Sequence, residues 1–229
     1  MWTAVKDFSQ LVADGRWKVE FFSGELEIAP DSAHPLVTLS SLVDESRLAV
    51  DPQDAPDRLY NYLGMENVES LTGDLLGFSP RPGSEIRSRS KVFKEGNVLY
   101  GRLRPYLNKV YLARGQVAEG ICSGEFFVLV PHEARVRPIV LRYLLASKLV
   151  VDHLARFQSG AALPRVPVRD LLGIKVPLPP MDAQGHLESA LVAYEDRRRS
   201  LRKELDRMPS AAMDALTQSL RDGRPLVAI

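Results

Sequence analysis

The residues best suited to contact a large anion lie in one stretch, residues 96–110. An apolar run, Asn-Val-Leu-Tyr, leads there into a polar loop. The contact candidates in this loop are Arg102, Arg104, Tyr106, Asn108 and Lys109. Arg can bond guanine through two hydrogen bonds, Asn can bond adenine in the same way, and Lys can hold a phosphate. The pattern favours nucleic-acid contact at or near base edges, and a solvated hairpin tip is the alternative that spacing leaves open.

Charge is unevenly distributed along the chain, although the formal net charge is only +1. Residues 14–74 include 13 acidic and 4 basic side chains, whereas residues 81–114 include 9 basic and 2 acidic ones. A concentrated basic block in a near-neutral protein usually faces an anion, and nucleic acid is the commonest large one. Within this block, residues 84–91 alternate small polar and basic side chains. They predict phosphate contacts by Arg87, Arg89 and Lys91, with a flexible polar loop as the alternative.

The sequence lacks the residue patterns of most other chemistries. The single cysteine, Cys122, excludes an intramolecular disulfide, and the four histidines have no metal-ligand spacing. The glycine-rich phosphate loops and the nucleophile-elbow motif are missing. We therefore expect no catalytic residue, metal or cofactor in this chain. No apolar run is long enough to span a bilayer, so we also expect no membrane association and a cytoplasmic location.

The elements that would position the candidates alternate short apolar runs with turns up to residue 178. Expected strands are 60–65, 97–100, 109–113, 125–130 and 174–176, and the nearly all-apolar run 125–130 predicts an interior strand. Residues 36–50 predict a short element with leucines at helical spacing, and 136–157 predict a helix that ends before Gly160. Weaker helix and strand signals fall at 7–12 and 16–22. This pattern predicts an α+β domain over residues 1–178, with a mixed twisted sheet and a covering helix.

Residues 179–229 have a different character, because apolar side chains recur at alternating intervals of four and three. The repeat consists of Leu187, Leu191, Tyr194, Arg198, Leu201, Leu205 and Met208. It predicts a coiled-coil seam with one charged break, Arg198. We expect Pro209 to interrupt this helix and Ser210 to cap a second, shorter one. Packing of the helix on its own domain is the alternative, but a narrow stripe between charged faces favours a partner helix.

Several of these stretches, taken together and in order, resemble the specificity subunit of type I restriction–modification systems. They are residues 62–68, 99–109, 122–126, 159–166, 174–184 and 214–226. The resemblance implies a target recognition domain followed by a long helical spacer, and it adds Arg165 to the candidate DNA contacts. Specificity subunits of full length carry two recognition domains and two spacers. This chain has room for one of each, so it resembles a half-subunit or a piece of a longer protein, such as a fused methyltransferase.

The resemblance also implies a function in phage defence. The chain would bind duplex DNA sequence-specifically, without catalysis, and present it to an adenine-N6 methyltransferase subunit that binds S-adenosylmethionine. A translocating restriction subunit that uses ATP is a further candidate partner. Two copies pairing antiparallel through the seam would form a homodimer and read a palindrome with an unread spacer of roughly 5–8 base pairs. A protein-binding coiled-coil adaptor and an unrecognised nuclease remain as alternatives.

Overall fold

The computed structural model describes residues 32–155 and 163–222. The expected elements at 7–12 and 16–22, and the helix stop at Gly160, lie outside these residues. The chain forms two compact units, Met1–Gln184 and Gly185–Ile229, and each is described by itself. The division thus falls a little after the expected boundary at residue 178.

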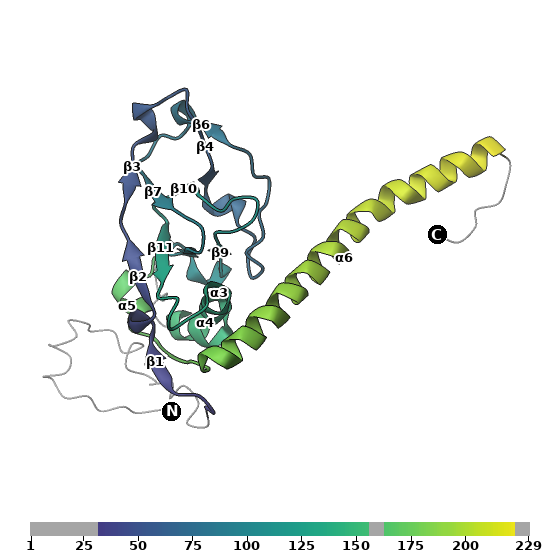
Figure 1. Cartoon of the computed structure of the whole chain (residues 1–229). Coiled ribbons are helices and arrows are strands. Elements are labelled where there is room, and N and C mark those ends of the chain that lie inside the picture. The colour runs from purple at the N-terminus through teal and green to yellow at the C-terminus, as the bar shows by residue number, and fades with distance from the viewer. Residues whose placement is uncertain (1–31, 156–162, 223–229) are drawn as a thin grey trace, which may run out of the picture. The chain divides into compact units, whose positions relative to one another are not determined.

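Two four-stranded sheets form the frame of the first unit (Figure 1). One has the order β2-β11-β8-β9 and is antiparallel throughout, with β2 Val43–Ser46, β11 Phe126–Pro131, β8 Val98–Gly101 and β9 Val110–Leu112. The other has the order β3-β7-β10-β5, with β3 Ala49–Val50, β7 Ser90–Phe93, β10 Gly120–Cys122 and β5 Tyr62–Leu63. Strands β10 and β5 are parallel, so this second sheet is mixed. The predicted α+β class with mixed sheets is confirmed, and β11 is the interior strand that its apolar run indicates.

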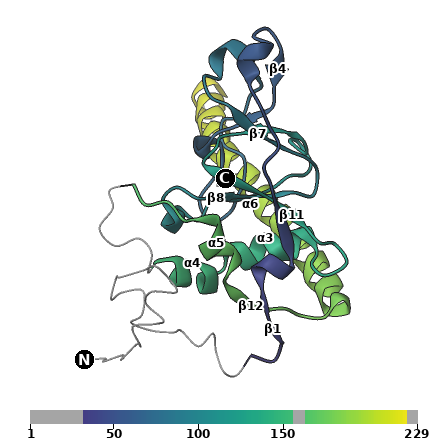
Figure 2. The same ribbon diagram turned by 90° about the vertical axis from the view of Figure 1, so that its left-hand side faces the viewer.

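Smaller elements complete the first unit, and Figure 2 shows α3, α4 and α5 gathered near β1 and β12, away from β4. Strand β1 (Leu36–Thr38) pairs with β12 (Lys175–Pro177), and β4 (Leu59–Tyr60) pairs with β6 (Arg81–Pro82). The α-helices are α3 Pro138–Ala146, α4 Lys148–Ala155 and α5 Val168–Leu172. Short 3-10 helices are η1 Leu39–Ser41, η2 Pro52–Asp54, η3 Met65–Asn67, η4 Gly83–Glu85 and η5 Pro105–Leu107.

Three expected elements of the first unit are wrong in detail. The expected strand 60–65 is divided among β4, β5 and η3, so it is not one strand. The segment 36–50 is not helical: η1 joins β1 to β2, and this single turn still places Leu39 and Leu42 in the core together. The expected helix 136–157 is broken at Ser147, whose backbone is extended with ψ 151°. The break is stabilised because the carbonyl of Ser147 accepts from the amides of Val150 and Val151, which starts α4.

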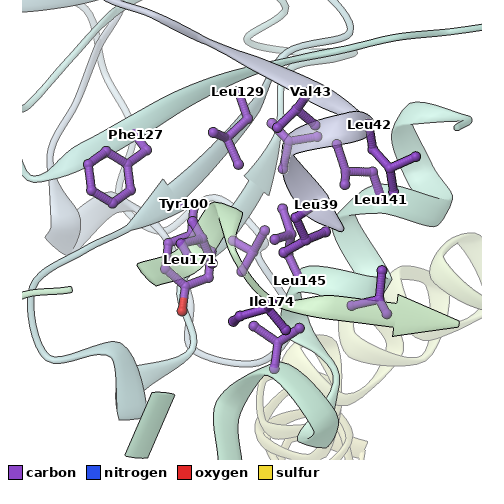
Figure 3. Packing of buried hydrophobic residues seen from close by; sticks show 14 of the residues in the cluster. Leu39, Leu42, Val43, Tyr100, Phe127, Leu129, Leu141, Leu145, Leu171 and Ile174 are labelled. Carbon is purple, nitrogen blue, oxygen red and sulfur yellow. The ribbon is translucent and has the colours of Figure 1, made fainter. Parts of the chain in front are cut away.

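The main core lies where the antiparallel sheet meets η1, α3 and α5. Figure 3 shows Tyr100 and Leu129 of the sheet close to Leu39 of η1 and Leu171 of α5. All four side chains are at most 1% exposed. Burial of each large apolar side chain contributes about 1.5–3 kcal/mol, so this cluster fixes the sheet on which the polar loops sit.

The long C-terminal helix α6 (Met181–Asp222) begins within the first unit. Gln184, in its first turn, is fully buried and bonds three backbone groups of the first unit. Its side-chain oxygen accepts from the amide of Arg137 at 2.9 Å, and its nitrogen donates to the carbonyls of Arg135 (3.0 Å) and Pro179 (2.9 Å). These bonds explain why the first turn belongs to the globular unit.

Helix α6 is continuous and includes Pro209, so the expected interruption of the helix at Pro209 is wrong. A proline removes only one backbone donor, and the turns on both sides keep their own hydrogen bonds. The Ser210 hydroxyl donates to the carbonyl of Arg207 at 3.0 Å instead of capping a new helix. The predicted seam therefore continues into a longer exposed helix, with Met213, Leu216 and Leu220 also exposed.

Candidate nucleic-acid interface

Three stretches that are distant in sequence meet just beyond β8. The amide of Arg102 donates to the carbonyl of Glu125 (2.8 Å), and the carbonyl of Arg102 accepts from Val166 (3.0 Å). The amide of Arg104 donates to the carbonyl of Pro164 (2.8 Å), with an antiparallel bridge between Leu103 and Arg165. Backbone hydrogen bonds thus join residues 102–104, the β10–β11 turn and residues 163–166 into one surface.

A fourth stretch, residues 62–68, supports this surface from beneath. The amide of Ser123 donates to the carbonyl of Leu63 (2.9 Å), and Lys109 Nζ donates to the carbonyl of Met65 (2.6 Å). A Cβ atom at Gly101 would lie 2.8 Å from the Met65 methyl carbon, so the Met65 side chain packs directly against the backbone at this position. Four of the stretches that resemble specificity subunits therefore form one structural neighbourhood.

Arg104 and Tyr106 have the side chains most available for DNA in this neighbourhood. Arg104 is exposed, and its guanidinium forms no hydrogen bond or ion pair with residues 32–155 or 163–222. Tyr106, in η5, is 52% exposed. Arg104 and Asn108 flank η5 and both have left-handed backbones, with φ 47° and 48°. This backbone geometry fixes the tip of the loop, which exposes the cation of Arg104 and the ring of Tyr106.

Lys109 and Asn108 lie at the base of the same loop and face the protein. The Lys109 ammonium is bonded to Met65, as described above, and Asn108 is only 5% exposed. The Asn108 amide nitrogen donates to the carbonyl of Ala146 at 2.7 Å, which satisfies an acceptor at the end of α3. The two residues therefore help to position the loop, because each donates a side-chain hydrogen bond within the protein.

Arg102 and Lys91 share the ring of Phe127. The Arg102 guanidinium carbon lies 5.3 Å and Lys91 Nζ lies 5.2 Å from the ring centroid, which is cation–π distance. Lys91 Nζ also donates to the carbonyl of Phe126 (2.9 Å) and lies 3.4 Å from Glu45 Oε1. Lys91 is thus tied to the frame, whereas Arg102 keeps a buried Nε without a partner in the described part of the chain.

Arg165 is the fifth cation of this region and is paired. Its guanidinium bonds both carboxylate oxygens of Glu125, at 2.8–3.1 Å. The bonds and the negative charge of Glu125 raise the pKa of Arg165. No local spacing in the sequence indicates Glu125 as a site residue, because it lies 40 residues from Arg165 along the chain.

Arg87 and Arg89 lie apart from this cluster, in the loop between η4 and β7. Both are exposed, and neither forms a hydrogen bond or ion pair with the part of the chain that the structure describes. Their guanidinium groups are therefore available to phosphates. The expected basic block divides into these accessible cations, with Arg104, and into cations that stabilise the fold.

The seam residues lie on α6, in the second unit. Leu187, Tyr194, Leu201 and Leu205 are 40%, 57%, 47% and 66% exposed, while Leu191 and Arg198 are half-buried. Large apolar side chains at heptad spacing and exposed on one helix are typical of a face that pairs with another helix.

No group of three His, Cys, Asp or Glu side chains in residues 32–155 and 163–222 is placed to hold a metal ion. None of the helices described there is long and apolar enough to cross a membrane.

These features define a class of protein: an α+β domain with a polar surface built from loops, followed by one long helix. Comparison with solved structures assigns the fold, which is that of one half of a type I specificity subunit. The HsdS subunit of Thermoanaerobacter tengcongensis matches with a TM-score of 0.65 and 23% identity, over 84% of this chain and 50% of that one. The S subunit of M. genitalium matches with a TM-score of 0.53 and 15% identity, over 80% of this chain and 45% of that one.

Sequence comparison agrees with the fold. The specificity subunit of the Escherichia coli type I restriction enzyme EcoDI is 27% identical over 172 residues, which cover 74% of this chain and 36% of that subunit. A structure that describes complex assembly of the type I R-M system contains a chain with a TM-score of 0.63 and 23% identity, matched over 85% of this chain and 50% of that one. No protein-family profile matches. The predicted resemblance is confirmed, and this chain spans half or less of each relative.

Proposed function

We propose that this chain is the DNA-recognition part of a type I-like restriction–modification or methyltransferase complex. It binds duplex DNA at a specific sequence and positions it for a partner that methylates adenine N6. The observation that carries the proposal is the convergence of the resembling stretches on one surface with the exposed guanidinium of Arg104, which has no partner among residues 32–155 and 163–222. An Arg side chain can read guanine in the major groove through two hydrogen bonds.

Phosphate contacts are assigned to the accessible cations of the basic block. Arg87 and Arg89 neutralise phosphates, while Arg104, Tyr106 and the cation of Arg102 lie nearer to base edges. Lys91, Asn108, Lys109 and Arg165 hold the loops in place, because each of them bonds a partner within the protein. This division predicts that only part of the +7 local charge contributes to the salt dependence of binding.

The partner subunits carry out the methyl transfer and any ATP-dependent restriction. S-adenosylmethionine binds in the methyltransferase subunit, and ATP in a restriction subunit where one joins the cytoplasmic complex. A single recognition domain reads only a few base pairs, which are too few for a useful genomic site. Two copies therefore pair antiparallel through α6 and read two half-sites related by two-fold symmetry.

Methylation-site mapping tests the function directly. The full chain is co-expressed with its neighbouring methyltransferase gene, and methylated adenines in the host DNA are located by sequencing. The expected result is one palindromic motif with an unread centre, absent when the chain is omitted. Methylation that is unchanged without the chain favours the protein-binding adaptor. DNA cleavage by the isolated chain in the presence of divalent metal favours a nuclease.

A further inference from the structure

Three non-glycine residues in the described chain have left-handed backbones, and all three lie in two loops that touch. They are Leu71 (φ 67°), Arg104 (φ 47°) and Asn108 (φ 48°). The amide of Leu71 donates to the carbonyl of Asn108 at 2.9 Å, which joins residues 69–74 to the loop of Arg104 and Tyr106. Crowding between Cβ and the carbonyl oxygen disfavours this conformation, and such residues cluster at functional sites.

The loop 69–74 is held rigidly from beneath by α3. Arg142, a residue of α3 that is only 3% exposed, donates to the carbonyls of Leu71 (3.1 Å) and Thr72. The amide of Gly73 donates to the carbonyl of Glu69 at 3.0 Å. A Cβ atom at Gly73 would lie 2.1 Å from the carbonyl oxygen of Val110, so any side chain at this position would clash with the backbone of β9.

This rigid loop presents a large apolar side chain to solvent. Leu71 is 68% exposed, although an exposed leucine in a strained conformation contributes nothing to the stability of the isolated domain. A backbone fixed in this way prevents the side chain from folding back onto the protein. Leu71 is also bonded to the loop whose tip carries the exposed side chains of Arg104 and Tyr106.

We propose that Leu71 is a wedge that enters the base stack of bound duplex DNA beside the Arg104 loop. The proposal rests on the DNA-recognition function above. Apolar side chains of this kind separate adjacent base pairs and bend the duplex, which lets more protein surface contact it. A wedge must be rigid, because a flexible side chain would lose conformational freedom on insertion. The hydrogen bonds of the loop to the Arg142 side chain and to the Asn108 carbonyl supply that rigidity.

A mismatch assay with the full chain tests the wedge. The probes are a fluorescent 30-base-pair duplex and the same duplex with one central mismatch, where unstacking is less costly. We expect the parent to bind the mismatched duplex at least about fivefold more tightly than the paired one. Leu71→Gly is expected to reduce that preference to less than about twofold. Glycine adopts φ 67° without strain, so the melting temperature should stay the same or rise, which separates the effect from misfolding.

Leu59→Gly provides a matched control, because Leu59 lies on β4 and is 67% exposed. This variant should keep the mismatch preference of the parent. Equal preference in the parent and Leu71→Gly, with both proteins binding DNA, overturns the wedge and leaves the proposed function intact. A variant that loses affinity for both duplexes by the same factor also overturns it, because Leu71 then contacts DNA without entering the stack. A parent that binds neither duplex overturns the proposed function itself.

Discussion

Arg165 and Glu125 form a two-pronged ion pair, in which Arg165 Nε lies 3.0 and 3.1 Å from the two carboxylate oxygens and Nη2 lies 2.8 Å from Oε1. The pair joins the segment that precedes α5 to the turn between β10 and β11. It also neutralises a cation at the edge of the candidate DNA surface. The pair therefore fixes two segments of the surface relative to each other and lowers the positive charge of that surface.

Removing the negative charge of Glu125 should strengthen non-specific DNA binding. Glu125→Gln keeps the size of the side chain and releases Arg165 to contact phosphate. The slope of log K against log salt should become steeper by about 1. Fluorescence anisotropy titrations at several salt concentrations measure this slope. Glu133→Gln, at an exposed carboxylate with no ion pair among the described residues, is the matched control for loss of an acidic charge and should keep a slope close to that of the parent. An unchanged slope in Glu125→Gln would contradict the expectation.

Arg104 and Arg87 should differ in their effects on DNA binding. Arg104→Ala is expected to weaken discrimination at one base pair of the mapped site by about 1–3 kcal/mol. Arg87→Ala should instead weaken binding to all sequences and lower the salt slope by about 1. Competition binding with single-base variants of the site separates the two effects. Lys91→Met is the control, because its ammonium is bonded to the Phe126 carbonyl and its loss should leave the slope nearly unchanged.

Asn108 should affect stability more than base recognition. Asn108→Ala leaves the half-buried Ala146 carbonyl without its side-chain donor and is expected to lower the free energy of unfolding by about 0.5–1.5 kcal/mol. Asn108→Gly removes the same donor but tolerates φ 48° freely, so it should be the less destabilised variant. Urea denaturation measures both variants. If Asn108→Ala keeps the parent's stability but changes the methylated motif, Asn108 reads a base after all.

The seam of α6 should hold two chains together. Replacing Leu191 and Leu201 by Asp places charges on the proposed contact face and should shift the mass measured by light scattering to that of one chain. The melting temperature of the globular unit should not change. Replacing Ser200 and Lys203, both exposed on α6, by Asp is the control for added charge. A parent that is already monomeric when its methyltransferase is bound would contradict the symmetric pair.

His132 should make stability depend on pH near neutrality. Its Nε2 lies 2.8 Å from Asp44 Oδ2 and its Nδ1 lies 3.2 Å from the carbonyl of Ser41, so the doubly protonated ring can donate to both. The hydrogen bond to Asp44, followed by the one to Ser41, raises the pKa of His132 above 6.5. The stabilisation is therefore complete below about pH 6.5 and is lost as the pH rises through the folded-state pKa. The melting temperature of the parent should exceed that of Asp44→Asn more at pH 6 than at pH 8.5. An equal difference at both values would contradict this assignment.

The sequence by itself determined the class of fold, the interior position of β11 and the helical character of the C-terminal part. These features follow from local patterns: a continuous apolar run for a strand buried on both faces, and heptad spacing for the seam. The ordered set of stretches was also enough to indicate the resemblance. Helical spacing at Leu39 and Leu42 was less informative, because a single 3-10 turn places them together as well as an α-helix does.

Only the tertiary structure decided which polar residues are available to a ligand. Lys91, Asn108, Lys109 and Arg165 are polar or basic like the accessible Arg87, Arg89 and Arg104, and a local pattern cannot separate the two groups. Their partners are Phe126, Ala146, Met65 and Glu125, which lie 35 to 44 residues away along the chain. A buried donor must find such an acceptor, and the fold alone brings the two together. The same reason explains why Leu71, an ordinary leucine in the sequence, became notable only through its bonds to Asn108 and Arg142.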